Sequence, residues 1–125
     1  MIYLVSCILY LVFSIYTKYK IQDTRYKFMT ISWYGQSCFK ITEQGGHLNL
    51  ITDPFDKSIG LTPPRASADI VIVTHSHHDH NNVSAIAGQP FIINGPGEYE
   101  VKGINITGIP AFHDQKQGEE RGLNT

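Results

Sequence analysis

The sequence predicts a strand-rich α+β domain, and three observations support this class. Hydrophobic residues make up 42% of the 125-residue chain and charged residues 17%, which is typical of a globular protein rather than a disordered one. Eleven glycines and six prolines supply many turns. The apolar residues fall in short runs of strand length, and a single short segment has the features of a helix.

Seven strands and one helix are expected in chain order. Each strand is a short apolar or alternating run between turn residues, and Gly45-Gly46 forms a hairpin turn between the second and third strands. The helix is expected to begin near Asn82 and to end at Gly88, because glycine commonly follows the last helical residue. The predicted strands cover residues 31–34, 38–42, 48–52, 70–74, 91–94, 99–102 and 104–109.

The most informative motif is His75-Ser-His-His-Asp-His80, which directly follows the apolar run of residues 69–74. In an extended segment, residues two apart project to the same side, so His75 and His77 can bind one ion at the end of the strand. Asp79 and His80 come after the chain changes direction and can face a second position close to the first. A cluster of this kind predicts a metal site for one or two ions.

The donor types narrow the choice of metal without fixing it. Neutral imidazoles and a carboxylate suit a borderline ion such as zinc, although manganese, iron or nickel would accept the same donors. His78 stands at a spacer position of the motif, so we expect it to pack against the protein or to face solvent. The alternative to a metal site is a histidine-rich surface loop that binds nothing.

The order H-x-H-x-D-H resembles the signature of the metallo-β-lactamase superfamily. The likeness extends from Met29 onward and is strongest to a small branch that includes ascorbate-phosphate lactonase-like zinc-dependent hydrolases. It implies an αββα sandwich, of which residues 29–125 would form the N-terminal half, because the glycine-aspartate motif and the last histidine of the family are not among them. The other matching segments are residues 30–41, 50–55, 95–101, 109–114 and 121–125.

The resemblance assigns roles to two further residues. His113 falls where the family carries its third imidazole, so that His75, His77 and His113 would hold the first metal. Asp53 matches a carboxylate that braces a ligand histidine from outside the metal's own shell. From the sequence alone, Asp53 before Pro54 is equally well explained as a turn residue.

The activity that these observations imply is metal-assisted hydrolysis of a small ester, lactone or phosphoester. A bound metal lowers the pKa of water from about 15.7 towards about 7, and Asp79 is the predicted catalytic residue that orients this water or carries its proton. Because the bridging aspartate and the last histidine of the family are not in the sequence, the alternative is a catalytically inactive metal-binding fragment or scaffold. A third hypothesis is a membrane-tethered accessory protein that keeps the fold for interaction.

Residues 1–28 form an apolar leader with two interpretations. Residues 1–16 are apolar and are followed by Lys18, Lys20, Arg25 and Lys27. As a helix they would be about 24 Å long, which is short of the roughly 30 Å hydrocarbon core. The leader is therefore either a membrane anchor, which would leave the metal domain in the cytoplasm because of the positive residues that follow it, or an extension without function.

Charge and cysteine usage restrict location and partners. From Met29 onward the chain has six Lys and Arg against ten Asp and Glu, and this acidic balance argues against a nucleic-acid partner. The two cysteines make no disulfide framework, which is compatible with the cytoplasm. Half of a two-sheet fold would expose a sheet face and an edge, so self-association is expected.

Overall fold

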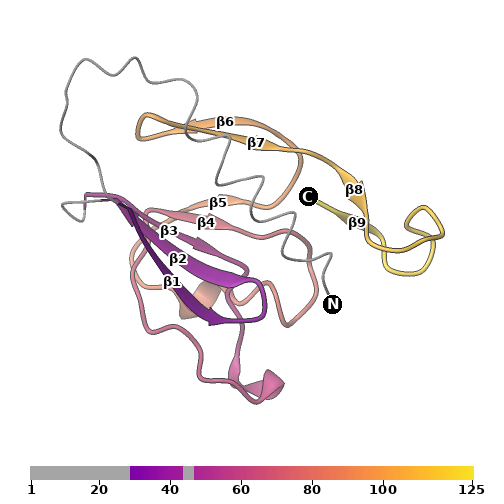
Figure 1. Cartoon of the computed structure of the whole chain (residues 1–125), viewed down its shortest axis with the longest axis horizontal. Helices are drawn as coiled ribbons and strands as arrows, with labels where there is room; N and C mark the ends of the chain where they lie inside the picture. The colour runs from indigo at the N-terminus through magenta and orange to yellow at the C-terminus, as the bar shows by residue number, and fades with distance from the viewer. Residues whose placement is uncertain (1–28, 44–46) are drawn as a thin grey trace.

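Strands dominate the part of the chain that the structure describes. The computed structural model describes residues 29–43 and 47–125, which form nine strands and two short 3₁₀ turns (Figure 1). The seven predicted strands are confirmed with shifted ends, whereas β8 and β9 were not predicted. The elements are β1 (Met29–Gly35), β2 (Cys38–Glu43), β3 (Asn49–Thr52), η1 (Lys57–Ile59), β4 (Ile70–Ile72), η2 (Val83–Ala85), β5 (Phe91–Ile93), β6 (Gly97–Val101), β7 (Ile104–Gly108), β8 (Ala111–Phe112) and β9 (Leu123–Asn124).

A mixed five-stranded sheet in the order β1-β2-β3-β4-β5 forms the centre of the fold. The first three strands are antiparallel, and β3, β4 and β5 run parallel, with Ile70 opposite both Leu50 and Phe91. All three residues of β4 are buried. A parallel strand with protein on both faces is expected to be continuously apolar, which explains the run of Ile and Val in this strand.

The two faces of the sheet pack against different parts of the chain. On one face Ile70 lies in an apolar cluster with Ile106 of the β6–β7 hairpin. On the other face Val71 lies in a second cluster with Phe55 and Ile86, which come from the long connections on either side of β4. Alternate residues of β4 therefore supply both cores, as the two-residue period of a strand requires.

The predicted helix at residues 82–88 is wrong. The segment forms the single 3₁₀ turn η2, and Ile86 is already extended at φ −90° and ψ 121°. The amide of Ala87 donates to the carbonyl of Ala66 at 3.0 Å, as part of a short parallel bridge between the two connections. This pairing needs extended backbone, so the tertiary contact overrides the local signals for a helix.

The interpretations of residues 1–28 and of the Gly45-Gly46 turn lie outside the described residues. Within residues 29–43 and 47–125, no helix is long and apolar enough to cross a membrane. The described part holds strands and 3₁₀ turns, so the helical layers of the predicted αββα sandwich stay a prediction.

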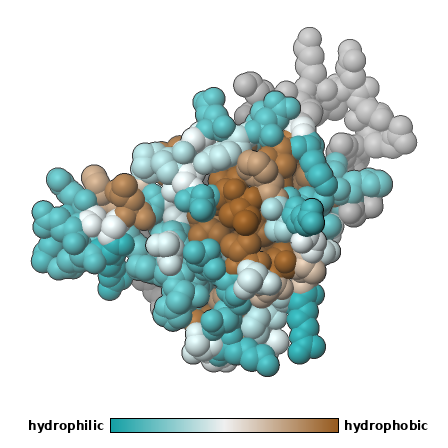
Figure 2. All heavy atoms as spheres, turned by 180° about the vertical axis from the view of Figure 1, so that it is seen from behind, coloured by the Kyte–Doolittle hydropathy of each residue, from teal (hydrophilic) through white to brown (hydrophobic). Residues whose placement is uncertain are grey.

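Several large apolar side chains remain exposed. Ile31 and Trp33 on β1 are 50% and 68% exposed, and Phe91 and Ile92 on β5 are 49% and 46% exposed. Both strands are edges of the five-stranded sheet. Figure 2 shows apolar side chains gathered in the middle of one face of the molecule, with polar side chains around them. Contiguous apolar surface of this kind commonly marks a contact surface.

Asp69 links the sheet to the β6–β7 hairpin. Its carboxylate accepts a hydrogen bond from the amide of Asn49 at 2.8 Å and pairs with the ammonium group of Lys102. These contacts, with the Lys102 hydrogen bond contributing most, lower the pKa of Asp69. A lowered pKa stabilises the fold above the ordinary aspartate value, and the contribution is lost as the pH falls through the folded value.

We predict that Asp69→Asn lowers the free energy of unfolding by about 1 kcal/mol at pH 7, because the ion pair is partly exposed. The difference from wild type should shrink as the pH falls below the ordinary aspartate pKa of about 3.9. Thermal melts from pH 7 down to pH 3 would measure it. Glu98→Gln, which removes an exposed carboxylate on β6, is the matched control. If the difference in unfolding free energy between Asp69→Asn and wild type stayed constant with pH, the assigned role of the Asp69 charge would be contradicted.

Candidate metal centre

The predicted site residues meet beyond the ends of β3 and β4. Asp53 directly follows β3, and the segment of residues 75–80 follows β4 after a short connection. Because β3 and β4 are parallel neighbours, these two segments leave the sheet at the same end of its strands. His113, which directly follows β8, reaches the same strand ends from a distant part of the sequence.

Three imidazoles form a compact cluster beyond these strand ends. One ring nitrogen each from His75, His77 and His113 can be chosen so that all three atoms lie within 4.8 Å of one another. The ring centroid of His75 is 4.5 Å from that of His77 and 4.4 Å from that of His113. The structure thus brings together the three residues that the family resemblance assigned to the first metal position.

The donor geometry fits a divalent metal ion. The Nε2 atoms of His75 and His113 face each other at 3.2 Å. Two imidazoles that share a tetrahedral zinc ion place their nitrogens about 3.3 Å apart, given bonds of about 2.0–2.1 Å. Burial first, and then the proximity of His80, His113 and His77, lower the pKa of His75 to about 4. His75 is therefore neutral at pH 7 and has a free lone pair, as a ligand requires.

Thr74 sets the tautomer of His75. Its hydroxyl donates to Oδ2 of Asp53 at 2.9 Å and lies 2.9 Å from Nδ1 of His75. A hydroxyl has one hydrogen, so the contact with His75 requires Nδ1–H of the ring to donate to Thr74. The lone pair of His75 is then on Nε2, which points at His113. Fixing the metal-binding nitrogen through the other ring nitrogen is a common feature of metal sites.

Asp53 and Ser37 hold His80 through the Nδ1 atom of its ring. Its Nδ1 lies 3.2 Å from Oδ2 of Asp53 and 2.8 Å from the hydroxyl of Ser37. Its Nε2 lies 3.4 Å from Oδ2 of Asp79. Burial disfavours the imidazolium, but the hydrogen bond that the His80 ring donates to Asp53 and the charges of Asp53 and Asp79 outweigh it and raise the pKa of His80.

Asp79 and His80 lie next to the three-histidine cluster, as a second metal position would require. The ring centroids of His75 and His80 are 4.2 Å apart. Within the described residues, however, Asp79 and His80 do not join a third donor to make a set of their own. His78 is not a member of the cluster, and 78% of its side chain is exposed, so it faces solvent.

Sequence reasoning missed three residues that shape the centre. Ser37 and Thr74 contact His80 and His75, and Asp114 accepts hydrogen bonds from the loop behind His113. A hydroxyl directly before the motif and a carboxylate directly after the third histidine were the available signals. Neither signal is specific, because Ser, Thr and Asp are common wherever a strand meets a loop.

A family model described as a beta-lactamase superfamily domain matches residues 30–125. The chain belongs to the beta-lactamase superfamily. The match covers every described residue that contributes to the centre, from Ser37 to Asp114.

This beta-lactamase superfamily chain is similar to several archaeal proteins named UPF0173 metal-dependent hydrolases. It is 26% identical over 118 residues to one from Methanopyrus kandleri, which covers 74% of this chain and 50% of the relative. It is 29% identical over 108 residues to one from Thermoplasma volcanium, which covers 66% of this chain and 47% of the relative. The chain therefore spans about half the length of these curated relatives. No solved structure matches it.

We predict that Asp53→Asn lowers the pKa of His80 from above to below the ordinary histidine value of about 6.5 in the metal-free domain. Burial would remain while the negative charge is lost. Asparagine tolerates the positive φ of 39° at this position, so the backbone should persist. NMR titration of the histidine ring protons measures the change.

Asp79→Asn is the control for this prediction and should lower the pKa of His80 less, since Asp79 contributes the smallest of the three favourable effects. A raised pKa stabilises the fold at a pH below the ordinary histidine value, and this contribution is lost as the pH rises through the folded value. The stability lost in Asp53→Asn through His80 should therefore be larger at pH 6 than at pH 8. An unchanged pKa of His80 in Asp53→Asn would rule out the assigned contact.

Proposed function

We propose that the protein is a metal-dependent hydrolase, with its metal centre at His75, His77 and His113. The observation that carries this proposal is the convergence of these three imidazoles, with the Nε2 atoms of His75 and His113 at 3.2 Å. The names of the curated relatives support it. A divalent metal bound here would polarise the substrate and lower the pKa of water.

Each residue of the centre has a proposed task. His75, His77 and His113 hold the first ion, and His80 and Asp79 contribute to a second. Asp79 is partly exposed and is the proposed catalytic residue, orienting the attacking water or accepting its proton at Oδ2. Asp53 fixes His80 directly and His75 through Thr74, which keeps both Nε2 atoms directed into the centre. The donor set suits zinc, although manganese, iron or nickel would accept the same donors.

The proposed substrate is a small ester, lactone or phosphoester. Residues 29–125 carry a net negative charge, so nothing in their composition favours a nucleic-acid substrate. The second candidate function is metal binding without turnover, because within the described residues Asp79 and His80 do not join a third donor to complete a second metal position. We further propose that residues 29–125 form the N-terminal part of an αββα sandwich in the cytoplasm, with residues 1–28 as an anchor or an extension.

Metal content tests the proposed centre. We predict that the full chain, purified without chelators, holds about one equivalent of zinc or a similar ion by elemental analysis. The double variant His75→Ala/His77→Ala should lose it, because two of three nitrogen donors are gone. The matched control is His47→Ala/His78→Ala, which removes two exposed histidines outside the cluster.

The outcomes separate the candidate functions. A protein that binds no metal, or a cluster variant that keeps as much metal as the control, would sink the proposed centre. Metal-loaded protein that hydrolyses nitrophenyl esters, lactones or phosphodiesters, with turnover lost on chelation, supports the hydrolase. Bound metal without turnover of any of these substrates supports metal binding alone.

Self-association is a separate proposal, supported by the exposed apolar residues on the edge strand β1. Ile31 and Trp33 lie two residues apart and so on one face of the strand. We predict a concentration-dependent dimer in sedimentation, which Ile31→Lys/Trp33→Lys should shift to monomer. Ser32→Lys places one charge on the opposite face and is the control. A monodisperse wild-type monomer at all concentrations would contradict the prediction.

A further inference from the structure

The loop between β8 and β9 is organised around one carboxylate. Oδ1 of Asp114 accepts hydrogen bonds from the amides of Lys116 at 2.7 Å and Gly118 at 3.0 Å. Oδ2 accepts from the amides of Glu120 at 3.0 Å and Arg121 at 2.8 Å. Four amides from six residues of chain thus converge on a single side chain.

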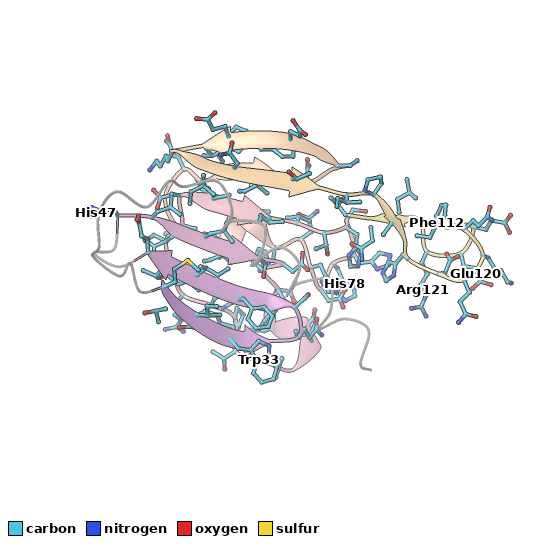
Figure 3. The ribbon with its side chains drawn as sticks, turned by 45° about the horizontal axis from the view of Figure 1, so that its top comes forward. Trp33, His47, His78, Phe112, Glu120 and Arg121 are labelled. Carbon is cyan, nitrogen blue, oxygen red and sulfur yellow. The ribbon has the colours of Figure 1, made fainter. Side chains whose placement is uncertain are left out.

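Outside this carboxylate, backbone hydrogen bonds hold the hairpin, including one from the amide of Thr125 to the carbonyl of Thr74 at 2.9 Å. β8 and β9 are two residues long each, and isolated pairs of such short strands are marginal in water. Phe112 and Leu123, which face each other across the pair, are 60% and 62% exposed. Figure 3 shows the loop extending away from the sheets, with Glu120 and Arg121 on it. Apolar packing therefore contributes little to its geometry.

This hairpin carries the third imidazole of the centre. His113 directly precedes Asp114, and its amide donates to the carbonyl of Gly122 across the loop at 3.2 Å. The other two imidazoles of the cluster come from the segment after β4, which leaves the buried sheet. His113 is thus the one member of the cluster whose position depends on the loop that Asp114 closes.

We propose that Asp114 is a positioning residue that holds His113 in place for metal binding. This inference rests on the metal centre proposed above. Asp114 acts through the loop and not as a ligand, because both of its oxygens already accept two amide hydrogen bonds each. Removing its charge frees the loop, and His113 then samples positions away from His75.

The test is Asp114→Asn in the full chain. The amide group keeps one acceptor oxygen but replaces the other with a donor, so two of the four hydrogen bonds are lost. Zinc affinity, measured by competition with a chromophoric chelator, should fall by roughly 10–100-fold, as is typical when a group that orients a ligand is removed. Hydrogen exchange of the four loop amides should accelerate.

Glu120→Gln is the matched control. It makes the same change in charge within the same loop, but it removes an exposed ion pair with Lys116 and leaves the amide of residue 120 bonded to Asp114. Zinc affinity should therefore stay within about twofold of wild type, since exposed ion pairs contribute little. If the charge of the loop mattered in general, zinc affinity would instead fall equally in Asp114→Asn and Glu120→Gln.

A double-mutant cycle separates positioning from general destabilisation. If Asp114 acts through His113, Asp114→Asn should have no further effect on zinc affinity when His113 is already alanine. Full additivity of the two changes would overturn the proposal, as would wild-type affinity in Asp114→Asn. If wild type and His75→Ala/His77→Ala bound zinc with the same affinity, that result would instead count against the proposed centre.

Metal-free protein gives an independent readout. In wild type the rings of His75 and His113 lie 4.4 Å apart, close enough for a nuclear Overhauser contact. We expect this contact to be lost or strongly reduced in Asp114→Asn and kept in Glu120→Gln. Retention of the contact in Asp114→Asn would overturn the positioning role whether or not the protein binds metal.

Discussion

Asp53 places a carboxylate that is 2% exposed between the ends of β3 and β4, where it accepts hydrogen bonds from the amide and the hydroxyl of Thr74 and contacts Nδ1 of His80. A buried carboxylate is very costly unless such partners surround it. The chain after β4 must therefore fold so that both Thr74 and His80 contact this carboxylate. The rest of the centre follows from this constraint, because Thr74 in turn fixes His75.

The same carboxylate explains why two neighbouring histidines have opposite acid–base properties. His75 contacts a neutral hydroxyl, and burial together with the nearby imidazoles lowers its pKa to about 4. His80 contacts Asp53 directly, and its pKa is raised despite its burial. In the metal-free protein His80 thus keeps its proton to a higher pH than a free histidine does, whereas His75 has a free lone pair at pH 7. Opposed shifts in adjacent groups are a recurrent feature of functional sites.

The centre combines two structural supports of different strength. His75 and His77 follow a strand that is buried on both faces, so the sheet core holds their starting point. His113 comes from a two-residue strand with exposed apolar neighbours, whose loop is closed by hydrogen bonds to Asp114. Regions with few buried contacts open at lower free energy than the core, so the third imidazole is where the geometry of the centre is most easily lost.

Local patterns in the sequence predicted the seven main strands and the histidine-rich segment of residues 75–80, because strand periodicity and ligand spacing can be recognised along the chain. His113 and Asp53 were assigned from the resemblance to a family, since nothing local distinguishes one histidine or one Asp-Pro turn. The absence of a helix at residues 82–88 could not be predicted locally, because pairing of Ala87 with the preceding connection overrides the local signals. The tertiary structure was also needed to establish the roles of Ser37, Thr74 and Asp114, whose hydrogen bonds join segments or close a loop that the one-dimensional pattern cannot bring together.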